Sequence, residues 1–275
     1  MSNQRTHHVT TTDGVIIGAT VHGHGPPLVF LQGSIGDGDL DWRAVAGHLT
    51  SRFTCHLPSM RGRGLSGDHP DLSFGRLVDD FVAYVDSIGE PVGLVGWSAP
   101  FGLAAAARSD AVAAVAYFES SMLSQMDEQE QAAVGGILAR TSELAAEGRL
   151  ADAARAFARF PFDDDEIAAG ENAGYWEAAG RYVPNLLKHL QLAMAEGDPI
   201  ADPAVLGAIS VPVLVLLGSD TKRLFTASAR AVTDRVPNAR MREIPGAGHA
   251  GPLTHPAALA EAFTEFFEPA RTTLS

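Results

Sequence analysis

Short apolar runs alternate with amphipathic stretches along most of this chain. The runs that predict buried strands lie at residues 27–31, 53–57, 92–96, 112–118, 211–217 and 239–244. The amphipathic stretches that predict helices between and after them lie at residues 42–49, 74–88, 100–108 and 257–267. Strand and helix in regular alternation indicate βα units and therefore a mostly parallel central sheet flanked by helices, an α/β fold.

The first part of the chain has a different pattern. Residues 8–11 and 15–22 read as two strands separated by Asp13-Gly14. An Asp-Gly pair between strand-like runs is a hairpin signal, because it suits a tight turn with positive φ. The sheet is therefore expected to begin with antiparallel strands.

The alternation stops after Glu119. From residue 122 to residue 206 there is no strand pattern, and amphipathic helical stretches lie at residues 128–147, 150–160 and 175–196. The acidic run at residues 163–166 favours a helix start, since carboxylates stabilise helix N-termini. We therefore expect a core domain of residues 1–121 and 207–275 that is interrupted by a helical insertion at residues 122–206.

The composition of the chain argues against some classes of binding partner. The chain has 275 residues, 46% of them hydrophobic, and a formal net charge of −13. Such an acidic balance argues against nucleic acid or an anionic membrane as a partner. The polar first twelve residues and the absence of a long apolar run predict no signal peptide and no membrane span. A single cysteine, Cys55, excludes an internal disulfide, and we expect a cytoplasmic protein.

The first indication of a catalytic function is the segment around Ser98. The strand that begins at residue 92 ends abruptly in Gly96-Trp97-Ser98-Ala99, and an alanine-rich helix follows from Pro100. A strand that turns straight into a helix exposes the serine hydroxyl above the sheet edge and leaves the next backbone N–H free. This arrangement is typical of a nucleophile elbow.

Other segments, in order, make the pattern more specific. They are the strand ending in Gln32-Gly33-Ser34, the run from Arg61 to Ser66, the strand closed by Gly218-Ser219-Asp220, and the loop Pro245-Gly246-Ala247-Gly248-His249. Together with the elbow this set resembles the α/β-hydrolase superfamily over roughly residues 15–267. The resemblance implies the α/β-hydrolase fold, a helical lid formed by the insertion, and no metal ion or organic cofactor.

A serine hydroxyl needs a base and an acid that orients the base. We expect Ser98 to be the nucleophile and His249, in its glycine-rich loop after the last strand, to be the base. Asp220 follows the strand before the histidine strand and keeps the chain order serine, acid, histidine. Glu119, at the end of the strand after the elbow helix, is the alternative acid. The sequence leaves both open.

The resemblance also predicts the groups that bind substrate. The backbone N–H groups of Ser34 and Ala99 would form the oxyanion hole. Gln32 and Trp97 are expected to contact the substrate.

The chain departs from the family pattern at several positions. Gln32 stands where histidine is usual, Ser59 stands where an aspartate is common, and Pro100 and Phe101 stand where small glycines are common. Proline at position 100 removes no oxyanion donor, since the first helical turn leaves that N–H unpaired. Phe101 is expected to crowd the elbow helix against the strands beside it.

These residues predict a serine hydrolase that cleaves an ester, lactone or thioester of a small, largely apolar molecule. One alternative is a non-hydrolytic enzyme of the same fold, such as a cyclase, a lyase or a cofactor-free oxygenase. A second alternative is a binding protein for small ligands without catalysis. The sequence predicts neither the substrate's identity nor an oligomeric state.

Overall fold

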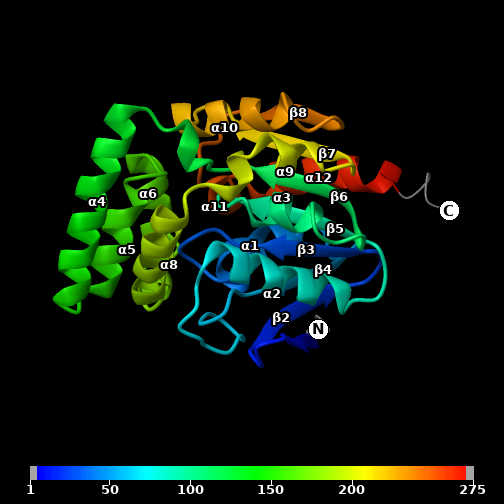
Figure 1. The fold of residues 1–275 in the computed structure, drawn as a ribbon, viewed down its shortest axis with the longest axis horizontal. Helices are drawn as coiled ribbons and strands as arrows, with labels where there is room; N and C mark the ends of the chain where they lie inside the picture. Colours follow the sequence, from blue (N-terminus) through cyan, green and yellow to red (C-terminus); the bar gives the residue numbers. More distant parts are fainter. Residues whose placement is uncertain (1–4, 271–275) are drawn as a thin grey trace.

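Eight strands within residues 5–270, the part of the chain described by the computed structural model, form one sheet (Figure 1). Their order across the sheet is β1-β2-β4-β3-β5-β6-β7-β8. Their bounds are β1 Arg5–Thr10, β2 Ile16–Gly23, β3 Pro27–Leu31, β4 Thr54–Pro58, β5 Val92–Trp97, β6 Val112–Phe118, β7 Val213–Gly218 and β8 Ala239–Ile244.

The sheet is parallel apart from its first edge. β1 and β2 pair antiparallel, β2 pairs antiparallel with β4, and every later pair is parallel. Gly14, in the turn between β1 and β2, has a φ of 84°, a conformation in which glycine has no steric penalty. The predicted antiparallel hairpin and the predicted mostly parallel sheet are both confirmed.

The central strands are buried on both faces, which explains their continuous apolar sequences. All residues of β3 and β5 are buried. Side chains alternate between the faces of a strand, so Leu28 and Phe30 join one hydrophobic core whereas Val29 and Leu31 join the other.

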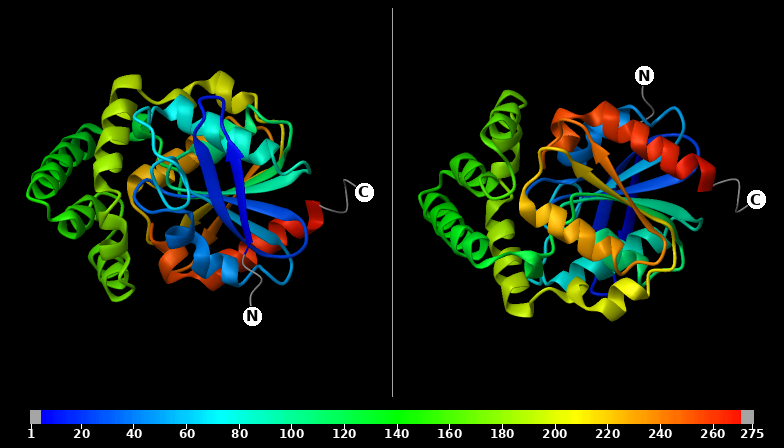
Figure 2. Two further views of the ribbon diagram at one scale, coloured as in Figure 1. Left: turned by 90° about the horizontal axis from the view of Figure 1, so that it is seen from below. Right: turned by 90° about the horizontal axis from the view of Figure 1, so that it is seen from above.

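Helices cover the two faces separately (Figure 2). α1 (Gly38–Gly47), α11 (Gly251–Thr254) and α12 (Pro256–Ala270) lie on the face of the first core, which contains Trp42 and Phe263. The opposite face carries α2 (Phe74–Asp86), α3 (Phe101–Ala106), α9 (Pro203–Gly207) and α10 (Arg223–Thr233). No helix in residues 5–270 is long and apolar enough to cross a membrane.

Five α-helices between β6 and β7 form a separate group beside the sheet (Figure 1). They are α4 (Glu128–Ala146), α5 (Leu150–Ala158), α6 (Asp164–Asn172), α7 (Tyr175–Gly180) and α8 (Val183–Glu196), flanked by the short helices η1 (Leu123–Gln125) and η2 (Pro199–Ala201). Buried residues of this group, such as Phe157 and Trp176, belong to the same hydrophobic core as Trp42 of α1. The insertion and the α1 face of the sheet therefore share one core.

One helix of the insertion differs from the sequence prediction, and another agrees with it. The expected helix at residues 175–196 is two helices, α7 and α8, because Pro184 lies in the first turn of α8 and cannot continue a helix from α7. The acidic run does begin a helix, α6, with Asp163 and Glu166 in a reciprocal capping box. Glu166 is buried, however, because it faces the core domain rather than solvent.

Candidate active site

Ser98 lies in a strained turn at the carboxyl end of β5. Its φ is 63°, a left-handed conformation that is uncommon for a residue with a side chain. Hydrogen bonds on both sides stabilise this conformation: the Ser98 N–H donates to Phe118 O (3.2 Å) and the Ser121 N–H donates to Ser98 O (2.7 Å). The turn has the backbone geometry of a nucleophile elbow.

The bulky residues after the elbow are accommodated by packing. Pro100 is the N-cap residue of α3, and Phe101 is fully buried at the first position of that helix. The Phe101 ring stacks on Phe74, with ring centroids 5.3 Å apart, and also packs on Phe81. Phe101 therefore fills space toward α2 and does not displace the elbow.

His249 lies in the loop after β8 and is 2% exposed. Its Nδ1 is 2.8 Å from Oε2 of Glu119. A carboxylate at this distance fixes the tautomer with the proton on Nδ1, so Nε2 is left as a proton acceptor. Burial is the main influence on the pKa of His249 and lowers it, so the imidazole is neutral at pH 7.

Glu119 is held from two sides. It is fully buried at the end of β6, with a φ of 52°, and its Oε1 accepts a hydrogen bond from the Gly218 N–H at 2.9 Å. Asp220 lies two residues beyond Gly218, and its side chain is exposed and accepts a hydrogen bond from the Ser219 hydroxyl. Of the two predicted acids, the structure brings Glu119 into contact with His249.

Aromatic side chains and a tryptophan N–H position the imidazole. The Phe225 ring stacks on His249 with centroids 4.0 Å apart and an interplanar angle of 14°. Nε1 of Trp97 donates to His249 O at 2.9 Å. Trp97 is 1% exposed and contributes to the wall of the same cavity as Ser98.

Ser34 and Ala99 both line this cavity. Within residues 5–270, neither backbone N–H has a hydrogen-bond partner. Their position beside Ser98 is compatible with the oxyanion role predicted from the sequence.

Gln32 lies outside the cavity lining. It is fully buried, its Nε2 donates to Gly36 O at 2.5 Å, and its Oε1 accepts from the Met60 N–H at 2.7 Å. Both ends of the amide are thus engaged by backbone groups. Gln32 therefore stabilises the loop at residues 33–37, and its side chain does not line the cavity where the sequence predicted a contact with substrate.

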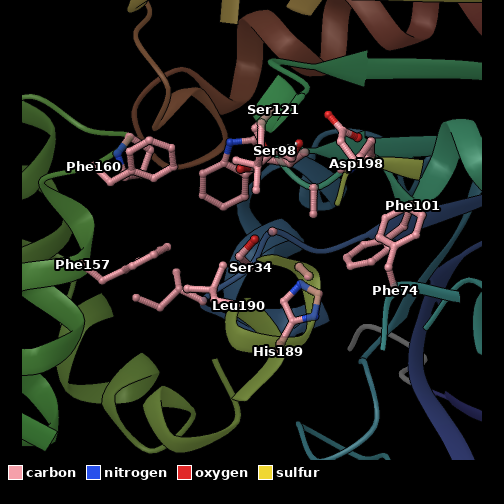
Figure 3. Close-up of a pocket in the computed structure, with 18 of the residues that line it drawn as sticks. Ser34, Phe74, Ser98, Phe101, Ser121, Phe157, Phe160, His189, Leu190 and Asp198 are labelled. Carbon is pink, nitrogen blue, oxygen red and sulfur yellow. Dashed lines mark hydrogen bonds between the residues drawn. The ribbon is translucent and has the colours of Figure 1, made fainter. Parts of the chain in front are cut away.

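The cavity at Ser98 is small and apolar (Figure 3). Its volume is about 90 Å³. Phe157, Phe160 and Leu190 come from the insertion, and Phe74 and Phe101 form the opposite wall. His189, also in the lining, donates to Leu72 O through Nδ1, and burial lowers its pKa to about 4, so it is uncharged.

Three residues that contact the site carry no clear sequence signal. Phe225 occupies a buried position of an amphipathic helix, which predicts only core packing. Glu166 of the insertion accepts from the Ala250 N–H at 2.5 Å, next to His249, and burial raises its pKa to about 7. Asp41, in α1, accepts from the Gly33 N–H at 2.9 Å.

The sequence matches one protein-family model. The model describes the alpha/beta hydrolase family and matches residues 21–262.

Solved structures with the same architecture cover the chain almost completely. An alpha/beta hydrolase from Sphaerobacter thermophilus is 27% identical, with a TM-score of 0.76 over 95% of this chain and 100% of that chain. A thermophilic esterase from Thermogutta terrifontis is 22% identical (TM-score 0.73, 97% and 99%). A bromoperoxidase from Bacillus anthracis is 16% identical (TM-score 0.77, 96% and 100%).

Proposed function

Because the chain belongs to the α/β-hydrolase family, we propose that it is a serine hydrolase that cleaves the ester, lactone or thioester of a small, largely apolar molecule. One observation carries this proposal. The Glu119 carboxylate is hydrogen-bonded to His249, and His249 and the strained Ser98 line one cavity.

The proposed reaction begins with attack of Ser98 Oγ on the substrate carbonyl carbon. His249 Nε2 takes the hydroxyl proton, and the Glu119 carboxylate stabilises the imidazolium that forms. The N–H groups of Ser34 and Ala99 bind the oxygen that becomes negative. Proton transfer from His249 to the leaving oxygen or sulfur gives an acyl-enzyme on Ser98. Water, deprotonated by His249, then releases the acid and restores the serine.

The lining of the cavity supports the substrate class. Aromatic and aliphatic side chains dominate it, and the titratable side chains among its residues are His249, Asp198 and the neutral His189. The cavity volume of about 90 Å³ suits a short acyl group. The insertion would act as a lid that excludes bulk water from the reaction.

Hydrolysis of p-nitrophenyl acetate and butyrate by the purified protein tests this proposal. We expect saturable turnover, together with covalent labelling by a fluorophosphonate that peptide mass spectrometry assigns to Ser98. Loss of the label after heat denaturation is the control for labelling that needs the folded site. Absence of both turnover and label would count against a serine hydrolase and in favour of non-hydrolytic chemistry in the same cavity.

An apolar groove adjoins the cavity and could hold the far end of a longer substrate. It has a volume of about 650 Å³, lies between α2, α3 and α9, and shares the lining residues Phe74 and Pro199 with the cavity at Ser98. Phe74 thus lines both the short acyl site and the larger apolar space. We expect it to limit the length of the chain that can be bound.

Replacing Phe74 by alanine should therefore raise kcat/KM for a p-nitrophenyl octanoate relative to the acetate. A gain of at least about tenfold is expected, because burial of only two of the six additional methylenes, at roughly 0.8 kcal/mol each, already supplies that factor. Adding Val205→Trp, which fills the groove, should cancel the gain if the chain enters there. A gain that persists in the double variant would show that the longer chain takes another path.

A further inference from the structure

The loop at residues 33–37 carries the Ser34 N–H and is held by buried side chains on both sides of that residue. On one side, the Gly33 N–H donates to Oδ2 of Asp41 at 2.9 Å. On the other, Gly36 O accepts from Nη1 of Arg63 at 2.8 Å and from the Gln32 amide. The direction of the Ser34 N–H therefore depends on groups that never touch the cavity.

Asp41 uses its second oxygen to bind the helical insertion. Its Oδ1 accepts from the Tyr175 hydroxyl at 2.7 Å, and both side chains are about 1% exposed. The loop packs directly on this pair, because a Cβ at Gly36 would lie 1.8 Å from Oδ1 of Asp41 and 2.8 Å from the Tyr175 hydroxyl. The carboxylate thus joins the first residue of α7 to the loop that carries Ser34.

The surroundings make the charge of Asp41 sensitive to pH. Burial raises the pKa of Asp41 to about 7. The hydrogen bonds from Tyr175 and Gly33 and the charge of Arg63 oppose that rise, whereas the neighbouring Asp37 carboxylate adds to it. Both carboxylate oxygens accept hydrogen bonds, so protonation would remove one acceptor from the arrangement.

We propose that Asp41 and Tyr175 are positioning residues for the oxyanion hole: Asp41 holds Gly33 so that the Ser34 N–H faces the reacting carbonyl, and the Tyr175 hydroxyl holds Asp41. The inference rests on the proposed hydrolase function. It couples the insertion to the chemistry, since the hydroxyl that completes the arrangement comes from α7.

The sign of the pH effect follows from the hydrogen bonds. The ionised form of Asp41 is the form that accepts from both donors, so activity is expected to fall as pH falls through the Asp41 pKa. The hydrogen bond from Tyr175 lowers that pKa. Removing the hydroxyl raises the pKa and moves the acid limb of the kcat/KM profile to higher pH.

Replacing Tyr175 by phenylalanine tests the proposal. We expect kcat for a p-nitrophenyl ester to fall about tenfold with little change in KM, less than the 10²–10³ lost with an entire oxyanion donor. The acid limb of the pH profile should move to higher pH. The rate of Ser98 labelling by a fluorophosphonate should fall in parallel, because phosphonylation also develops charge on an oxygen.

Tyr182→Phe is the matched control. Tyr182 also reaches from the insertion to the start of α1, where its hydroxyl donates to Asp37 at 2.5 Å and accepts from the Gly64 N–H at 3.1 Å. Loss of this hydroxyl should lower Tm without moving the acid limb. A shift of the limb in Tyr182→Phe equal to that in Tyr175→Phe would overturn the proposal, since it would reflect general loosening.

Asp41→Asn gives an independent test. An asparagine does not titrate. In a Glu166→Gln background, which removes the other carboxyl beside the site with a pKa near 7, the acid limb should drop toward the lower pKa of His249, while kcat is reduced at pH 8. A limb that stays near pH 7 in this variant contradicts the proposal. Failure of the hydrolase function itself would be recognised separately, as a wild-type protein that neither turns over esters nor reacts with the phosphonate.

Discussion

Replacing Ser98 by alanine is expected to abolish ester turnover. Loss of a serine nucleophile from a triad lowers kcat by about 10⁶, and the residual rate comes from the oxyanion donors and binding. The new alanine would lie in the same left-handed turn, whose backbone hydrogen bonds to Phe118 and Ser121 need no side chain. The fold should therefore survive, which circular dichroism and Tm would verify.

Ser121→Ala is the matched control for this variant. Its hydroxyl also lies at the cavity and donates to Ser98 O at 3.1 Å, but the stronger backbone hydrogen bond from the Ser121 N–H remains. We expect most of the activity and the fluorophosphonate label to be retained. Turnover by Ser98→Ala comparable to wild type would eliminate Ser98 as the nucleophile.

Replacing Glu119, the carboxylate that contacts His249, is expected to cause the second large loss of activity. Glu119→Gln keeps the shape of the side chain, and its amide can still accept from the Gly218 N–H, but it removes the charge beside His249 Nδ1. The imidazole then loses both the carboxylate that fixes its tautomer and the charge that stabilises its protonated form. A fall in kcat of about 10⁴ is expected, as for an amide in place of a triad aspartate.

Asp220→Asn separates the two predicted acids. Asp220 is exposed and bonded to Ser219, so its charge is screened by water and this variant should retain activity. Steady-state kinetics of both variants at pH 8, with KM and kcat determined separately, make the comparison. The reverse outcome, an inactive Asp220→Asn and an active Glu119→Gln, would assign the acid to Asp220 and require the loop after β7 to rearrange.

Much of the fold could be read from the sequence because burial on both faces of a parallel sheet gives continuous apolar runs. The elbow was equally visible, since Gly96-Trp97-Ser98 closes such a run and a helix follows. Pro184 shows the limit for helices: a strong amphipathic pattern at residues 175–196 concealed the break between α7 and α8.

The acid could not be chosen from the sequence because β6 and β7 are neighbours in the sheet. Both strands end beside the histidine loop, so chain order alone leaves Glu119 and Asp220 equally placed. The left-handed backbone at Glu119 and the hydrogen bond from Gly218 decide which carboxylate reaches the imidazole. Gln32 shows a similar limit, because its amide is engaged by loop backbone that only the folded chain brings together.

The hydrophobic core that the insertion shares with the α1 face affects both thermal unfolding and the entry of substrate into the cavity. Phe157 and Trp176 pack in the same cluster as Trp42, so swinging the insertion away as a rigid flap would hydrate apolar surface at about 25 cal/mol per Å². Both parts should therefore unfold in a single cooperative transition. Substrate entry should depend on small excursions of side chains at the rim rather than on hinged opening.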